Sequence, residues 1–243
     1  MYSIIRYVMS QAPLKKLNSS NDLYIDKYKV YSQMSNTRKV NSVFVSRKTI
    51  LELLEFSGYN VDDYSNFLIN EVDAMYKTSQ LDMLIKHKTE NKKVYVKYYL
   101  PEKQKQIQKN VLDDIVEDLF VIENVLSKDD TLVIIMDDEP NETTLIRLTY
   151  LFEKEGIFIV IHNMKRLQFN ILKHTLVPEI SILSDSEASE FMTSINIKSL
   201  AQLPEISRFD PQALAVCLRP KQICKLERSS PTSAKSVFYR VCV

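Results

Sequence analysis

Two short apolar runs separated by one helical pattern constrain the fold of this chain most. Leu132 to Met136 and Ile157 to Ile161 have the length and the β-branched composition of buried strands. Between them, Leu145 and Leu148 follow helical spacing, and Gly156 stops the pattern. A strand, a helix and a strand in this order predict a parallel pair of strands joined by a crossover.

A hairpin and three helices are predicted before this unit. Alternating apolar residues predict strands over residues 81–85 and 94–98, with a polar turn between them. Helical spacing predicts a helix over residues 42–57 that is capped by Gly58, and a second helix from Asp62 or Asp63 to Lys77. A third amphipathic helix is predicted within residues 103–127, with one apolar face of Ile107, Val111, Ile115, Leu119, Ile122 and Leu126. Residues 41–165 therefore predict an α/β domain of about four strands, with helices covering at least one face.

The pattern changes after residue 165. Ser184 followed by Glu187 forms a capping box, and Asp210 before Pro211 predicts the start of another short helix. Residues 222–228 and 237–243 predict paired strands joined by a polar turn. We therefore expect a small α+β domain over residues 166–243.

Residues 1–40 are polar, basic and aperiodic. They predict an extension that is flexible or ordered by a partner, and the alternative is an ordinary frayed terminus.

Composition excludes several classes of function. The chain has 2 glycines in 243 residues, which excludes the glycine-rich phosphate loops of Rossmann and P-loop enzymes. Its 3 cysteines and 3 histidines are widely spaced, so no zinc site is expected. No apolar run spans a bilayer and no signal peptide is evident, so we expect the chain to stay on the reducing side of membranes. Abundant Asn, Lys, Ile and Ser suggest an AT-rich genome, such as that of a large DNA virus.

A run of motifs in the C-terminal part resembles one known family. His174-Thr175-Leu176-Val177-Pro178-Glu179 followed by Leu183 resembles the signature H-x-L-V-P-E-H-x-x-L, which is shared by the fifth RNA polymerase subunit of eukaryotes and its shorter archaeal counterpart. Family-like spacing then continues through Leu203-Pro204-x-Ile206, Asp210-Pro211, Lys225-Leu226-x-Arg228-x-Ser230-x-Thr232 and Tyr239-Arg240-Val241. The N-terminal part resembles the jaw domain of the eukaryotic type, which is opened by a helix resembling the one that contains Arg47-Lys48-Thr49-Ile50.

The resemblance implies a non-catalytic subunit with a jaw-like N-terminal domain and a C-terminal assembly domain. The expected partners are the largest polymerase subunit, a homologue of the sixth subunit and downstream duplex DNA, with no membrane and no small-molecule substrate. Expected partner-binding residues are His174, Leu176, Val177, Pro178, Glu179, Leu203, Pro204, Asp210, Pro211, Lys225, Arg228, Ser230, Thr232, Tyr239 and Arg240. Separately from the resemblance, Lys86, Lys88, Lys92 and Lys93 cluster at the tip of the predicted hairpin, where they would contact DNA phosphates or, more simply, form a solvated turn.

No cofactor is expected on this chain, since Mg and Zn would belong to other subunits. The expected location is the nucleus for a cellular protein, or the viral factory and virion for a viral one.

The chain departs from the family pattern at four positions. Ile180 replaces the second histidine of the signature, and Cys217, Lys221 and Ala234 replace family glycines. A left-handed backbone strains residues other than glycine, which argues against left-handed turns at the last three positions.

Other interpretations compete with these expectations. Asp82 and Lys97 on adjacent strands resemble the layout of a PD-(D/E)xK nuclease, but Tyr95 stands where a second carboxylate must hold the metal. A free-standing transcription adaptor is the other rival.

Single features also have simpler explanations. His174 is a candidate general base or, more simply, a structural residue. Leu176 to Pro178, taken alone, predict a buried extended segment. Lys225, Arg228 and Arg240 would form a cross-strand basic patch for nucleic acid or acidic partners or, more simply, a solvated face. The helix face of Asp113, Asp114, Glu117 and Asp118 would pair carboxylates on a metal or, more simply, face solvent.

Overall fold

The computed structural model describes the backbone of residues 20–101, 107–230 and 232–243, and the side chains of residues 37–101, 107–230 and 232–243. Residues Val40–Val243 form one compact unit, which contains two four-stranded sheets. The predicted mixture of helices and strands is confirmed, whereas the boundary near residue 165 and the division into jaw-like and assembly domains stay predictions. None of the described helices is both long enough and apolar enough to cross a membrane.

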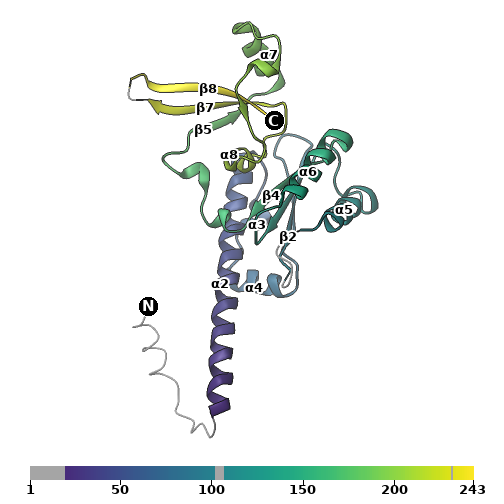
Figure 1. The fold of residues 1–243 in the computed structure, drawn as a ribbon, viewed down its shortest axis with the longest axis vertical. Coiled ribbons are helices and arrows are strands. Elements are labelled where there is room, and N and C mark those ends of the chain that lie inside the picture. Colours follow the sequence, from purple (N-terminus) through teal and green to yellow (C-terminus); the bar gives the residue numbers. More distant parts are fainter. Residues whose placement is uncertain (1–19, 102–106, 231) are drawn as a thin grey trace. The chain divides into compact units, whose positions relative to one another are not determined.

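The first sheet is mixed (Figure 1). Its strands follow the order β1 (Met83–Lys86), β2 (Lys93–Tyr99), β3 (Thr131–Met136) and β4 (Phe158–Asn163). The predicted hairpin is confirmed, because β1 and β2 pair antiparallel. The predicted parallel crossover is also confirmed, because β3 pairs parallel with β4, and β2 with β3. Every residue of β3 and β4 is buried, which is typical of parallel strands covered on both faces.

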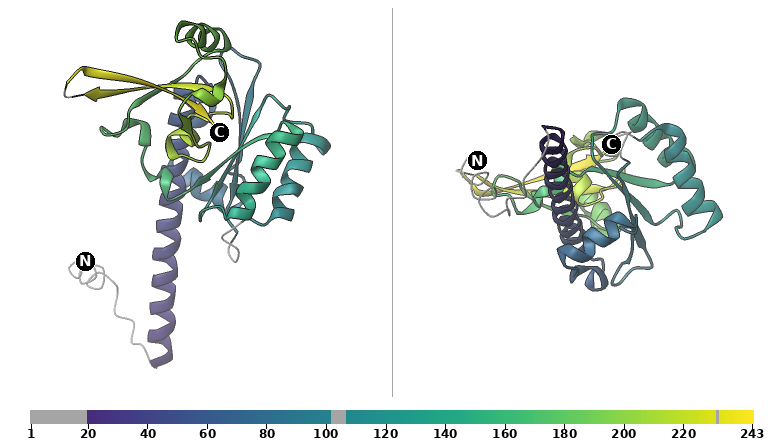
Figure 2. Two further views of the ribbon diagram at one scale, coloured as in Figure 1. Left: turned by 45° about the horizontal axis from the view of Figure 1, so that its top comes forward. Right: turned by 90° about the horizontal axis from the view of Figure 1, so that it is seen from below.

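Helices cover both faces of this sheet (Figure 2). On one face, Val43, Ile50 and Leu54 of α2 (Ser20–Phe56) pack in one core with β3 and β4. On the other face, α5 (Lys109–Glu117) and α6 (Glu142–Tyr150) pack against the opposite side chains of the same two strands. The alternation of side chains along each strand therefore supplies two separate cores.

Helix α2 begins earlier than predicted. It starts at Ser20, whereas no helix was predicted before residue 42, and residues 1–19 lie outside the described part. The expectation that residues 1–40 are flexible or ordered by a partner stays a prediction. No proline or glycine interrupts the sequence between Ser20 and Ser57, so the helix that packs on the sheet can continue toward the N-terminus. The predicted end is confirmed: Gly58 has a left-handed φ of 88°, and the Tyr59 N–H donates to the Leu54 carbonyl over 3.0 Å.

The helix predicted from Asp62 to Lys77 is broken in two. The structure has α3 (Asp62–Ser65) and α4 (Ile69–Lys77). The Leu68 N–H donates to the Glu71 carboxylate over 2.7 Å, which starts the second helix, while the Phe67 ring turns onto the buried guanidinium of Arg47 at 5.3 Å. Packing around Arg47 therefore overrides the continuous helical pattern.

Helix α5 also departs from its predicted stripe. It continues as the π-helical segment η1 (Asp118–Ile122), whose wider turn shifts the positions that face the sheet. Ile122 is consequently 68% exposed, whereas Leu112, Ile115 and Leu119 are buried as core residues.

The second sheet has the order β5 (Glu179–Ile182), β7 (Ile223–Ser230), β8 (Ala234–Cys242) and β6 (Glu205–Ile206). The predicted antiparallel hairpin of β7 and β8 is confirmed, while β5 and β6 were not predicted. The predicted capping box of Ser184 and Glu187 opens α7 (Asp185–Ser194). The Asp210 carboxylate caps α8 (Pro211–Ala215) by accepting from the Gln212 N–H over 2.8 Å.

Left-handed turns occur at all three positions where glycine is replaced. Cys217, Lys221 and Ala234 have φ values of 51°, 73° and 59°, so the argument against left-handed turns there is wrong. Surrounding hydrogen bonds hold this conformation: the Leu218 N–H donates to the Ala213 carbonyl over 2.9 Å, and the Lys221 N–H to the Cys242 carbonyl over 2.9 Å. The fold thus keeps the turns and tolerates the strain.

Candidate partner-binding surface

The signature segment forms a turn that exposes Leu176. The Val177 N–H donates to the His174 carbonyl over 3.0 Å, and the Leu176 N–H donates to His174 Nδ1 over 3.2 Å. The imidazole of His174 therefore braces the turn, which fits a structural role. Leu176 is 86% exposed, so the interpretation of Leu176 to Pro178 as a buried segment is wrong. An apolar side chain held out by a braced turn suits contact with another protein.

The end of the signature is tied to the C-terminal sheet. The Gln212 side-chain amide donates to the Pro178 carbonyl over 2.6 Å, which joins the turn to α8. Glu179 is exposed at the start of β5, whereas Ile180 is 5% exposed and packs with Cys224 and Leu226. The replacement of the family histidine by Ile180 therefore supplies a core side chain.

Several predicted partner-binding residues have a role in the fold, and their contact with a partner stays a prediction. Leu203 is buried with Ile223 and Val241, and the Pro204 carbonyl accepts from the Val241 N–H over 2.9 Å. Asp210 and Pro211 begin α8. These side chains and backbone groups hold in place the segments that carry the candidate partner-binding surface.

The basic residues of the terminal hairpin do not lie on one face. Lys225 pairs with Tyr239, whereas Arg240 pairs with Cys224. Because successive residues of a strand point to opposite faces, Lys225 lies on one face and Arg228 and Arg240 lie on the other. The hypothesis of a single cross-strand patch of all three is therefore wrong.

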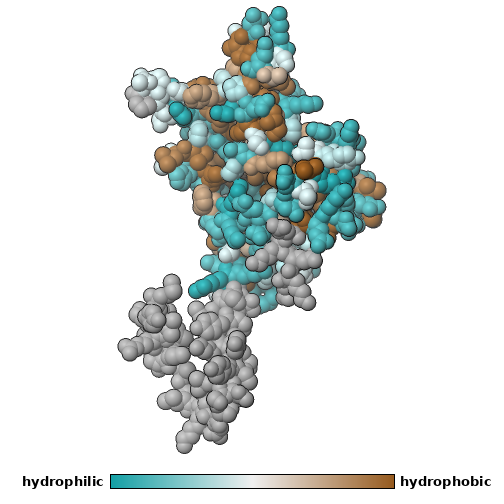
Figure 3. All heavy atoms as spheres, viewed as in Figure 1, coloured by the Kyte–Doolittle hydropathy of each residue, from teal (hydrophilic) through white to brown (hydrophobic). Residues whose placement is uncertain are grey.

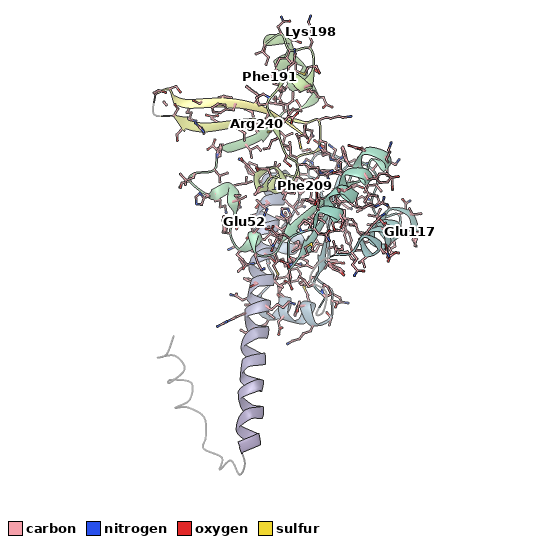
Figure 4. The ribbon with its side chains drawn as sticks, viewed as in Figure 1. Glu52, Glu117, Phe191, Lys198, Phe209 and Arg240 are labelled. Carbon is pink, nitrogen blue, oxygen red and sulfur yellow. The ribbon has the colours of Figure 1, made fainter. Side chains whose placement is uncertain are left out.

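Each of these cations has a local contact. The Lys225 ammonium lies 4.0 Å from the Glu227 carboxylate, and Arg228 lies over the Phe238 ring at 5.3 Å. Arg240, which Figure 4 marks on β8, donates to the Glu205 carbonyl over 2.8 Å. At the hairpin tip, the Ser230 and Thr232 hydroxyls lie 3.2 Å apart.

The hairpin also exposes apolar side chains that the sequence pattern did not single out. Val237 and Phe238 are each 45% exposed, and hydrophobic side chains lie among hydrophilic ones over β7 and β8 (Figure 3). Val237 and Phe238 lie in the sequence like the apolar residues of an ordinary strand, so the pattern does not mark them as surface residues. They are recognised as such only because both faces of the hairpin are exposed in the structure. Together with Leu176 they supply exposed apolar area in the C-terminal part.

The four lysines predicted near DNA lie at the β1–β2 hairpin, as expected for a tip. Lys86 and Lys88 are exposed, but Lys92 pairs with Glu90 at 2.5 Å. Lys93 is half-buried, and its backbone N–H donates to Asp130 Oδ1 over 2.6 Å. Lys86 and Lys88 are therefore the better candidates for phosphate contact.

The nuclease-like layout is present without its second carboxylate. Lys97 Nζ lies 3.4 Å from Asp82 Oδ2, and the Tyr95 hydroxyl donates to the same oxygen over 3.2 Å. Burial, with the neighbouring Asp82 carboxylate, raises the pKa of Tyr95 to about 12. Tyr95 thus stays protonated at neutral pH and gives no anionic ligand for a divalent metal.

The acidic helix face gives no better metal site. Asp113 pairs with Arg147 at 2.8 Å, whereas Asp114, Glu117 and Asp118 are exposed. In the described part of the chain, no group of three or more His, Cys, Asp or Glu residues is placed to hold a metal ion.

Comparisons with known proteins agree with the C-terminal motifs. The family model described as RNA polymerase Rpb5, C-terminal domain, matches residues 169–242. The DNA-directed RNA polymerase subunit Rpo5 of Thermococcus kodakarensis is 38% identical over 76 residues, which is 31% of this chain and 92% of that subunit. The chain belongs to the Rpb5 family. The Rpo5 subunits of Archaeoglobus fulgidus (39% over 77 residues, 32% of this chain and 100% of that subunit) and Staphylothermus marinus (42% over 80 residues, 33% and 87%) are similar.

The Rpb5-family match separates the two groups of predicted site residues. Leu176 and the β7–β8 hairpin lie inside the matched residues 169–242. The lysine hairpin and the Asp82 cluster lie outside them.

Proposed function

We propose that this chain is a non-catalytic subunit of a multi-subunit DNA-directed RNA polymerase. One observation carries the proposal: its C-terminal part is similar to 92% and 100% of the length of two archaeal subunits of such polymerases. The shared part is thus nearly a whole polymerase subunit, which favours this role over a free-standing adaptor.

The proposed docking element is residues 174–243, and the proposed partners are the largest subunit and a homologue of the sixth subunit. Leu176 at 86% exposure, with the half-exposed Val237 and Phe238, supports burial against another protein. The matched region contains all three. Polar hairpin residues around them would form the rim of the interface.

The N-terminal part is proposed to lie near downstream duplex DNA. Exposed Lys86 and Lys88 at the β1–β2 hairpin support contact with phosphates, which would be independent of base sequence. Catalysis and the metals that it needs are proposed to belong to other subunits, since Tyr95 occupies the position of the missing carboxylate.

The test is recovery of the tagged chain from its native source at high salt. The unchanged chain should bring down two very large catalytic subunits and RNA synthesis activity. Leu176→Asp should weaken that recovery, because burying a carboxylate at a contact centre costs at least about 2 kcal/mol, roughly thirtyfold in affinity.

Ile146→Asp is the matched control. Ile146 is 64% exposed on α6, outside the family match, so the same substitution should leave recovery unchanged. Recovery of the unchanged chain alone, without polymerase activity, would overturn the proposed function and favour the adaptor. Equal recovery of Leu176→Asp and Ile146→Asp would overturn the proposed docking turn.

A further inference from the structure

A cavity of about 140 Å³ lies along strand β4. Apolar side chains of Leu145, Leu148 and Leu218 form part of its wall, and polar side chains of His162 and Arg208 form another part. Its lining includes neither the exposed apolar residues proposed for docking, Leu176, Val237 and Phe238, nor Asp82. Its chemistry is thus unexplained by the proposed function.

Arg208 is a buried cation that has no anionic partner among the described residues. The residue is 5% exposed, and one guanidinium nitrogen, Nη2, donates to the Ile159 carbonyl over 3.1 Å. The other, Nη1, is buried and has no hydrogen-bond partner among the described residues. Nor does any carboxylate in that part of the chain form an ion pair with Arg208. A buried charge of this kind normally requires a counter-charge.

Aromatic rings hold the Arg208 guanidinium in place. It lies over the rings of Phe152, Phe158 and Phe209 at 5.5, 5.3 and 5.2 Å, and Figure 4 marks Phe209. These contacts compensate part of the buried charge, but they leave the hydrogen bonds of Nη1 unmade. The guanidinium of this cavity-lining residue is therefore held in place with one donor unused.

His162 adds a second unused polar atom to the same cavity. The residue is 5% exposed and its Nε2 atom is buried without a partner in the described part of the chain. Burial, together with the charge of Arg166, lowers the pKa of His162 to about 4, although a hydrogen bond with the Leu214 backbone opposes the shift. The ring is thus neutral at pH 7, and Arg208 remains the buried charge of the cavity.

The other charges near the cavity compensate each other. Glu139 and Arg166, which also line it, form an ion pair at 2.7 Å. Glu139 is therefore engaged away from Arg208. An entering anion would meet a net positive wall.

Size and polarity together define a ligand class. A cavity of about 150 Å³ lined by apolar side chains can hold benzene, and this one is of similar volume. Water alone would satisfy the hydrogen bonds of Nη1 but would not neutralise the charge. We propose that the cavity binds a small amphipathic carboxylate, with the carboxylate on Arg208 Nη1 and the apolar body against Leu145, Leu148 and Leu218.

Benzoate is the probe, and benzamide is its uncharged isostere. Both are titrated into the full-length chain, with binding measured by calorimetry and thermal shift. We expect benzoate to bind at least tenfold more tightly than benzamide. Arg208→Met, which keeps the bulk and removes the charge, should weaken benzoate at least tenfold. Equal binding of both probes, no binding of benzoate at millimolar concentration, or unchanged benzoate binding by Arg208→Met would overturn the site.

A second variant tests the site in case Arg208→Met does not fold. Leu145 is half-buried on α6, so Leu145→Phe should fill the apolar end while the fold is kept. Benzoate binding should fall at least tenfold in Leu145→Phe, and unchanged affinity would overturn the proposal.

The carboxylate could come from a free acid or from an acidic side chain of a partner. Benzoate that binds both the free chain and the assembled complex identifies a free acid as the source. Benzoate that binds only the free chain identifies a partner side chain that fills the cavity on assembly. Either result supports the carboxylate site.

Discussion

Ala234→Gly is expected to stabilise the fold by about 0.5 to 1 kcal/mol. Ala234 is exposed at the tip of the β7–β8 hairpin with a φ of 59°. A left-handed backbone costs a residue with a Cβ about 1 to 2 kcal/mol. Glycine removes that cost but gives the unfolded chain more freedom, which costs about 0.4 to 1 kcal/mol. The strain is the larger of the two.

The assay is urea unfolding of the full-length chain, with a rise in melting temperature of about 1 to 4 °C as a second readout. Ala201→Gly is the matched control, because Ala201 is also exposed but does not have a positive φ. Glycine there should destabilise the fold by about 0.5 to 1 kcal/mol. If Ala234→Gly destabilises the chain as much as Ala201→Gly, the argument from backbone strain is refuted.

Three further predictions concern stability. Gly58→Ala should lower the free energy of unfolding in urea more than Gly156→Ala does. Both glycines have a left-handed φ, but a Cβ at Gly58 would lie 2.7 Å from His87 Nε2, whereas the atom nearest to a Cβ at Gly156 is 3.7 Å away. Equal losses of stability would contradict the His87 contact. Cys217→Gly should gain less than Ala234→Gly in the same assay, since the Cys217 side chain packs against the core; an equal gain would count against that packing. Burial lowers the pKa of His162 from 6.5 to about 4, so the unfolded chain binds a proton that the folded chain does not, and the free energy of unfolding should fall as the pH drops from 6.5 toward 4. His162→Gln should flatten the stability profile in that window, and an unchanged profile would contradict the role of His162.

Local signals in the sequence predicted most elements. The Asp210 cap, the Ser184 capping box and the Gly58 and Gly156 stops all mark helix ends in the structure. These signals depend on hydrogen bonds or φ values within a few residues, which sequence patterns can express. The period-2 alternation of the β1–β2 hairpin succeeded for the same reason.

Failures occurred where distant contacts decide the outcome. Packing of Phe67 on Arg47 breaks a continuous helical pattern, and β6 exists because Glu205 and Ile206 pair with the end of β8. The exposure of Leu176 depends on the turn closed by His174 and on the tie from Gln212 to Pro178. None of these contacts has a periodic signature in the chain.

The Rpb5-family motifs therefore contain residues that hold the fold and residues that are exposed for contact, and the sequence alone does not distinguish the two kinds. The Asp210 carboxylate caps the helix that carries Gln212, and Gln212 in turn holds the Pro178 carbonyl beside the exposed Leu176. A motif residue can thus be needed for the proposed binding without touching a partner, because its loss would release the turn that presents the proposed contact. Loss of Leu176, by contrast, would leave the turn intact, since its braces are the backbone and the His174 ring. Folding and binding measured on the same variants separate the two kinds.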